Sequence, residues 1–145
     1  MNIQEIQTQL TNELSSRTGW FEKYDFIISA GERLSPMDER YRTEEFAVSG
    51  CQSQLWIASE LINGNMVLHG DSDAKITRGL VALLFKVLNN RTPDEVVRAE
   101  LNFLDDTGIL TALSPLRANG LASIISSIKS HARRYQNDQP GKIEA

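Results

Sequence analysis

The sequence predicts an α+β fold, in which several helices pack against a small antiparallel sheet as a two-layer sandwich. Apolar residues recur at helical spacing near both ends of the chain, whereas residues 44–70 contain short strand-like segments around the turn signal NGN at 63–65. With 41% hydrophobic residues, the 145-residue chain has enough apolar side chains for one core. We therefore expect a single domain over residues 1–145, with a disordered polar tail over about 137–145.

Two helices are expected at the start of the chain. Asn2 and Glu5 match a capping box, and apolar residues follow them at helical spacing: Ile3, Ile6, Leu10 and Leu14. A second helix is predicted from about Thr18 to Ala30, with Gly31 as its stop. The polar residues 32–44 are expected to form a surface connection.

The middle of the chain is predicted to form about three strands. The strand-like segments are EEFAVSG (44–50), QLWIASELI (54–62) and MVLHG (66–70), and the last two flank the NGN turn. The following DSD sequence (71–73) suits the start of a helix, because its side chains can cap the helix and its charges favour the positive end of the dipole. Further helices are predicted over 92–101 and from 114 onward, each opened by a capping residue and a proline.

Composition excludes several classes of function. A net charge of −4 and a pI near 5.2 give no basic field, so we expect no nucleic-acid partner. The longest strongly apolar run, LVALLF (80–85), is far too short to span a membrane, and the first residues do not resemble a signal peptide. The single cysteine allows no internal disulfide, which fits the reducing cytoplasm.

That cysteine, Cys51, is the leading candidate for chemistry. It follows Gly50 and precedes small or amide-bearing polar residues, which predicts a place on a loop tip rather than in the core. A nucleophilic thiol needs help from a cation, a base or backbone amides, because an unperturbed thiol is mostly protonated at neutral pH. The histidines, His69 and His131, lie on different predicted elements, so a Cys–His pair is disfavoured.

Three charged residues are weaker candidates. Arg117 lies near the start of the last predicted helix, where the dipole opposes a cation, although a surface ion pair would explain it equally well. Asp73 has an ordinary explanation as a helix-start carboxylate, and Asp105 with Asp106 as part of a turn. No spacing typical of a zinc site, an iron–sulfur site or a P-loop is present, so we expect no metal or cofactor on this chain.

Four segments together resemble the SufE family of sulfur-acceptor proteins. They are GWFEKYDFIISAGERL (19–34), GCQSQLW (50–56), GDSDAKITRGL (70–80) and LSPLRANGL (113–121), in the family's order and spacing. QSQ at 52–54 is more similar to the SufE branch than to the related CsdE branch. Leu116 departs from the family, which usually has a small polar residue there.

The resemblance implies a fold shared with IscU/NifU-type scaffolds and a role in sulfur relay. Cys51 would accept sulfur as a persulfide from a SufS-type cysteine desulfurase, stimulate that enzyme, and pass the sulfur to the SufBCD scaffold. Pyridoxal phosphate would belong to the desulfurase, not to this chain. By position, Asp73 matches the family's helix-start aspartate, Arg117 its arginine after Ser-Pro, and Asp105 an acidic position.

Several alternatives stay open from the sequence alone. They are a stand-alone cysteine-dependent enzyme, a CsdE-type partner of a different desulfurase, and an interaction module whose cysteine only packs. A homodimer is also compatible with the sequence. For a relay, we expect the thiol to be partly covered by apolar residues at rest and to turn outward on meeting the desulfurase.

Overall fold

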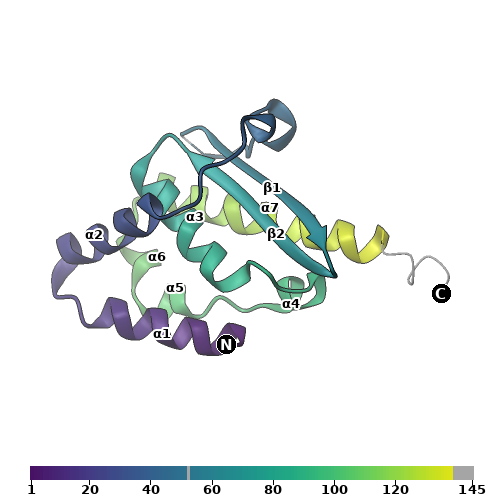
Figure 1. Ribbon diagram of the computed structural model, residues 1–145. Coiled ribbons are helices and arrows are strands. Elements are labelled where there is room, and N and C mark those ends of the chain that lie inside the picture. Colours follow the sequence, from purple (N-terminus) through teal and green to yellow (C-terminus); the bar gives the residue numbers. More distant parts are fainter. Residues whose placement is uncertain (52, 139–145) are drawn as a thin grey trace.

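The computed structural model describes residues 1–51 and 53–138 and shows one hairpin packed against helices (Figure 1). This confirms the predicted α+β class. The helices and strands, in chain order, are α1 (Ile3–Ser15), α2 (Gly19–Glu32), the 3₁₀ turns η1 (Glu39–Tyr41) and η2 (Glu44–Phe46), β1 (Leu55–Ile62), β2 (Asn65–Ser72), α3 (Lys75–Leu88), α4 (Pro93–Arg98), α5 (Phe103–Asp106), α6 (Ile109–Ala112) and α7 (Pro115–Asp138).

The sheet of the described residues has two strands. β1 and β2 pair antiparallel from Leu55 opposite Ser72 to Ile62 opposite Asn65. Asn63 and Gly64 join the strands with φ angles of 52° and 84°, the left-handed conformations that a two-residue type I′ turn requires. The predicted hairpin around NGN is therefore confirmed.

The prediction of a third strand over 44–50 is wrong. Its first residues form the 3₁₀ turn η2, and only Ala47 pairs with β1, as an isolated bridge to Trp56. Gly50 then adopts a φ of +84° and turns the chain away from β1 toward α7, where a Cβ on Gly50 would lie 2.7 Å from Ser123 Oγ. A left-handed residue ends the extended conformation that continued pairing would need.

The core lies between the hairpin and the helices. Figure 1 shows α3 and α7 beside the hairpin, with α1 on the far side of α3. α3 is buried along most of its length, because it contacts α1, α2, α7 and β2. The opposite face of the sheet is covered by a small cluster of Met37, Tyr41 and Ala58, and the Tyr41 ring stacks on His69 at 5.0 Å.

Gly31 does not stop α2, as the sequence suggested, but lies inside it. The helix continues to Glu32, and Gly31 faces Gly79 on α3. A Cβ on Gly31 would lie 2.8 Å from the Gly79 backbone nitrogen, and a Cβ on Gly79 only 2.2 Å from the Ile27 carbonyl oxygen. The two glycines therefore allow a close helix crossing, which has no sequence signature distinct from a helix stop.

The remaining boundaries follow local capping. The Asn2–Glu5 capping box is present, and Thr92 caps α4 with Pro93 at its first position, although α4 ends at Arg98 rather than 101. The DSD residues 71–73 do not open α3, because β2 extends to Ser72 and the helix begins at Lys75. α7 continues to Asp138, past the predicted start of the tail at 137, and residues 139–145 lie outside the described part.

Candidate functional site around Cys51

The loop that carries Cys51 is anchored at both ends. Its N-terminal anchor is the Ala47–Trp56 bridge followed by the close approach of Gly50 to α7. Its C-terminal anchor joins Gln54 to Asp73: the Gln54 N–H donates to Asp73 Oδ1 at 3.0 Å, and the Asp73 N–H donates to the Gln54 carbonyl at 3.3 Å. Gln52, which belongs to the motif, lies outside the described residues.

Asp73 therefore acts differently from the helix cap that its sequence suggests. The residue at the cap position of α3 is Ala74, which has no capping side chain, and the Asp73 carboxylate points instead to the cysteine loop. Ser72 reinforces the same anchor, since its hydroxyl donates to the Gln54 carbonyl at 2.7 Å. The aspartate thus holds the start of β1 against the end of β2 and anchors the loop that carries Cys51.

The Cys51 side chain is half-buried and packs against the hydrophobic core. Its Sγ lies 3.9 Å from Ser53 Oγ, and Ser53 Oγ lies 3.4 Å from the buried Thr77 Oγ1, which gives a short hydroxyl chain from the sulfur to α3. On the other side, a Cβ on Gly120 of α7 would lie 3.2 Å from Sγ. The thiol is therefore held between α3 and α7, as expected for a shielded sulfur.

A cavity of about 220 Å³ opens beside this thiol. Its lining brings Arg117 and Leu116, at the start of α7, to the same space as Cys51 and Ser53. Ser114 caps α7, because its Oγ accepts the Arg117 N–H at 3.3 Å. Among the described residues the Arg117 guanidinium forms no ion pair, so the surface ion pair considered from the sequence is absent there.

Asp105 is not brought to this cavity. It is exposed in the short helix α5, and its carbonyl accepts the Gly108 N–H in the turn that follows. That position fits the turn interpretation of Asp105 and Asp106. Cys51 and Arg117 thus line one cavity and Asp73 anchors the cysteine loop through Gln54, whereas Asp105 lies outside this cavity.

Neither histidine lines the Cys51 cavity. His69 Nε2 contacts Glu60 Oε2 at 2.9 Å on the outer face of the sheet, and His131 Nδ1 lies 2.6 Å from Ser59 Oγ. Burial and the nearby Arg134 lower the pKa of His131 from 6.5 to about 4, so this ring is neutral near pH 7. Both rings are therefore engaged elsewhere, and the described residues form no Cys–His pair.

Two residues of the site were missed in the sequence analysis. Thr77 interrupts the buried face of α3 with a hydroxyl, and a polar residue on an apolar helical stripe is a signal that could have identified it. Gly120 lies within α7 and faces the sulfur, which leaves no free room for a Cβ there, yet a helical glycine alone does not indicate what it faces.

Residues 1–51 and 53–138 contain neither a metal-binding cluster nor a membrane-spanning helix. No group of three or more His, Cys, Asp and Glu side chains in these residues is arranged to hold a metal ion. None of the helices in the same ranges has the length and apolar character needed to cross a membrane.

Comparisons with known proteins agree with this architecture. The family model described as "SufE: Fe-S metabolism associated domain" matches residues 8–132. An uncharacterized SufE-like protein of Synechocystis sp. is 37% identical over 118 residues, covering 81% of this chain and 74% of that protein. The solution structure of a hypothetical protein from Thermus thermophilus superposes with a TM-score of 0.76 at 17% identity, covering 92% of this chain and 97% of that one, which concerns the fold alone. The chain therefore belongs to the SufE family of Fe–S metabolism-associated domains.

Proposed function

We propose that this protein is a sulfur carrier whose Cys51 accepts a sulfane sulfur from a SufS-type cysteine desulfurase and delivers it to the SufBCD scaffold. The observation that carries the proposal is the lone thiol, half-buried at a cavity that Arg117 also lines. Family membership supports the link to Fe–S metabolism. The desulfurase supplies its own pyridoxal phosphate, and this chain contributes the acceptor thiol.

The transfer needs one thiolate and no second cysteine. The Cys51 thiolate attacks the terminal sulfur of the desulfurase persulfide, the S–S bond of that persulfide breaks, and the desulfurase cysteine leaves as a thiolate. Cys51 then carries the sulfur as a persulfide, so atoms and electrons balance without an added oxidant. Because the chain contains one cysteine, the persulfide has no thiol on the same chain that could resolve it to a disulfide.

Arg117 and Asp73 have different roles in this scheme. The guanidinium stabilises the anionic sulfur, either the attacking thiolate or the persulfide, since it lines the same cavity and has no carboxylate partner among the described residues. Asp73 positions the loop through Gln54 rather than contacting the sulfur. Asp105 retains only its match to an acidic position of the family, and its exposed site on α5 supports a contact with another protein better than a role at the thiol.

The test is sulfur transfer with a SufS-type desulfurase and cysteine. We expect intact-mass measurement to show one added sulfur atom on the wild-type chain, reversed by a reductant, together with faster desulfurase turnover. Cys51→Ser should show neither. An added sulfur on Cys51→Ser would reject the carrier proposal, whereas turnover of a small substrate without desulfurase would favour the stand-alone enzyme. Transfer from a different cysteine desulfurase but not from a SufS-type one would assign the CsdE-type role.

Arg117 is tested by its charge. We expect Arg117→Gln to slow persulfide transfer by about three- to tenfold, because a charge-assisted contact to the sulfur anion is lost, while Arg117→Lys recovers part of the rate. The matched control is Arg134→Gln, which removes an exposed cation from the other end of α7. Equal rates for Arg117→Gln and wild type would exclude the proposed role of Arg117.

A further inference from the structure

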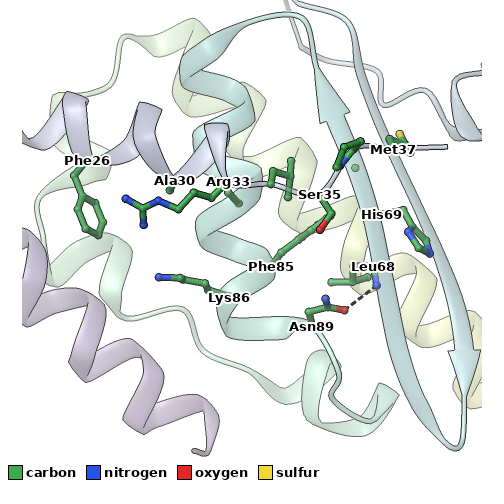
Figure 2. A pocket seen from close by; sticks show the side chains of 14 residues that line it. Phe26, Ala30, Arg33, Ser35, Met37, Leu68, His69, Phe85, Lys86 and Asn89 are labelled. Carbon is green, nitrogen blue, oxygen red and sulfur yellow. Dashed lines mark hydrogen bonds between the residues drawn. The ribbon is translucent and has the colours of Figure 1, made fainter. Parts of the chain in front are cut away.

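A second cavity, of about 270 Å³, shares no lining residue with the Cys51 cavity. It lies between the C-terminal half of α2, the segment 33–37 that follows it, β2, and the C-terminal half of α3 (Figure 2). The sulfur chemistry proposed for Cys51 makes no use of this space.

Most of its walls are apolar. The side chains come from both helices, the connecting segment and the strand: Phe26, Ala30, Leu34, Met37, Leu68 and Phe85. Gly70 of β2 forms part of the wall, and a Cβ there would lie 2.8 Å from Phe85 Cζ, so the phenyl ring packs directly under the strand backbone. Such walls favour an apolar group that leaves water.

The polar groups at this cavity are mainly donors. Arg33 from the end of α2 and Lys86 from α3 line it, and Figure 2 shows both side chains reaching the same way, toward Phe26. Ser35 adds a hydroxyl. Asn89 uses its Oδ1 to accept the Leu68 N–H at 2.8 Å, as the dashed line in Figure 2 shows, and this leaves its amide N–H groups as donors.

The two cations have no anionic partner within the described chain. Neither Arg33 nor Lys86 forms an ion pair or hydrogen bond with another described side chain, and no described Asp or Glu lines the cavity. Glu22 and Asp25 share a neighbouring surface hollow with Arg33 but form no ion pair with it. Both cations are therefore available to an anion at the cavity.

We propose that this cavity binds a small carboxylate with an apolar body. The apolar part packs against Phe85, Leu68 and Leu34, and the carboxylate lies between Arg33 and Lys86, toward Phe26. A bidentate guanidinium contact and an ammonium contact are the partners that a carboxylate prefers. The volume lies just below the range of about 300–1,000 Å³ typical of sites for drug-sized ligands, so the ligand is smaller than those.

The experiment is a titration of the full, ¹⁵N-labelled chain followed by amide chemical shifts. The probes are phenylbutyrate, phenylbutanol and phenylbutylamine, which share one apolar body and differ in charge. We expect saturable shifts with phenylbutyrate at residues 26–37, 68–70 and 82–89, binding at least about tenfold weaker for the alcohol, and none for the amine. A small ligand of this size is expected to bind with a dissociation constant of about 0.1–1 mM.

Charge variants then test the two cations separately from the walls. Arg33→Gln and Lys86→Gln should each weaken phenylbutyrate binding by about three- to tenfold and leave the weak binding of the alcohol unchanged. Lys75→Gln, which removes an exposed cation from the first turn of α3, is the matched control and should bind as the wild type does. All three positions are at the surface, so the variants are expected to fold.

Several results would overturn the proposal. They are equal binding of the alcohol and the carboxylate, shifts centred away from the cavity, no saturation at millimolar probe, and wild-type affinity for phenylbutyrate in a chain that carries both Arg33→Gln and Lys86→Gln. Sulfur transfer to Cys51 is measured independently, so failure of this binding site and failure of the carrier role are distinguishable.

Discussion

Replacing Gly120 by alanine should stabilise helix α7 and, at the same time, crowd the sulfur of Cys51. In the interior of α7 an alanine is favoured over glycine by about 0.5–1 kcal/mol, which stabilises the fold. The new Cβ would lie 3.2 Å from Cys51 Sγ and 4.0 Å from its Cβ, so the sulfur must move by a few tenths of an ångström to restore an ordinary contact of about 3.4–4 Å. Sγ is the end of a side chain on a loop, so it can give way.

The direction of that movement follows from what surrounds the sulfur. Ser53 Oγ is 3.9 Å away and is held near Thr77, whereas the cavity on the Arg117 side is open. We therefore expect Gly120→Ala to move Sγ into the cavity and expose it. The free energy of unfolding, measured with urea, should rise by about 0.5 kcal/mol. This is less than the full advantage of alanine over glycine in a helix, because the tight contact with Sγ offsets part of that advantage.

The assay is the rate of alkylation of Cys51 by a bulky maleimide, measured from pH 6 to 9 so that accessibility and thiol pKa are separated. A gain of about two- to fivefold across the pH range is expected from the greater exposure. Asn119→Ala, an exposed substitution on the same helix that also improves helix propensity, should stabilise α7 without changing the rate. A slower rate in Gly120→Ala, or the same gain in Asn119→Ala, would refute the reasoning.

Three further predictions concern the anchors of the site and the fold. Asp73→Ala should speed alkylation of Cys51 and lower the free energy of unfolding by about 1 kcal/mol, because the Gln54 N–H loses its acceptor. Asp73→Asn keeps an acceptor oxygen and should behave like wild type. Equal alkylation rates in the two variants would contradict the role of Asp73 as an anchor. Gly79→Ala should lower the free energy of unfolding by about 3 kcal/mol or more, since its Cβ would lie 2.2 Å from the Ile27 backbone oxygen. An unchanged urea midpoint would show that α2 and α3 separate easily. Because the folded pKa of His131 is about 4, below the ordinary 6.5, the unfolded chain binds this proton first and stability falls as pH drops through the window from 6.5 toward 4. At pH 5 we expect the free energy of unfolding to be about 1 kcal/mol lower, after a discount for solvent screening of this half-buried ring. His131→Asn should remove most of this loss. An equal loss in the variant would assign the pH dependence to carboxylates.

Sequence patterns predicted the parts of the fold that depend on local chemistry. The Asn2 and Thr92 caps and the Asn63-Gly64 turn each rest on residues within four positions of one another, so the sequence contains the whole interaction. The third strand failed for the opposite reason. Whether residues 44–50 pair with β1 depends on Gly50 packing against Ser123, a contact between distant parts of the chain.

In the site, too, single residues could be identified from the sequence, whereas their arrangement in space could not. Cys51 was identifiable as the only cysteine, and Arg117 as a cation against the helix dipole, but their shared cavity depends on how α7 packs beside the loop. Asp73 was assigned to a cap because carboxylates at helix starts are common, and the nearest N–H in sequence is not its partner. The Gly31–Gly79 crossing was read as a helix stop for a similar reason, since glycine serves both purposes.

The two anchors bear on how a shielded thiol can meet a partner. Gly50 packs against Ser123, and Gln54 is joined to Asp73 by one hydrogen bond to the carboxylate and one between backbone groups, so the loop ends are set by α7 and by the end of β2. We therefore expect an outward turn of the Cys51 side chain to leave both anchors in place, so that neither the hairpin nor α3 needs to move. Opening that breaks a few contacts to Gly120 and Ser53 is readily offset on binding, whereas breaking the Asp73 anchor would also release the start of β1. For the proposed carrier role, we expect the half-buried sulfur to be exposed to a partner by breaking only these weak contacts.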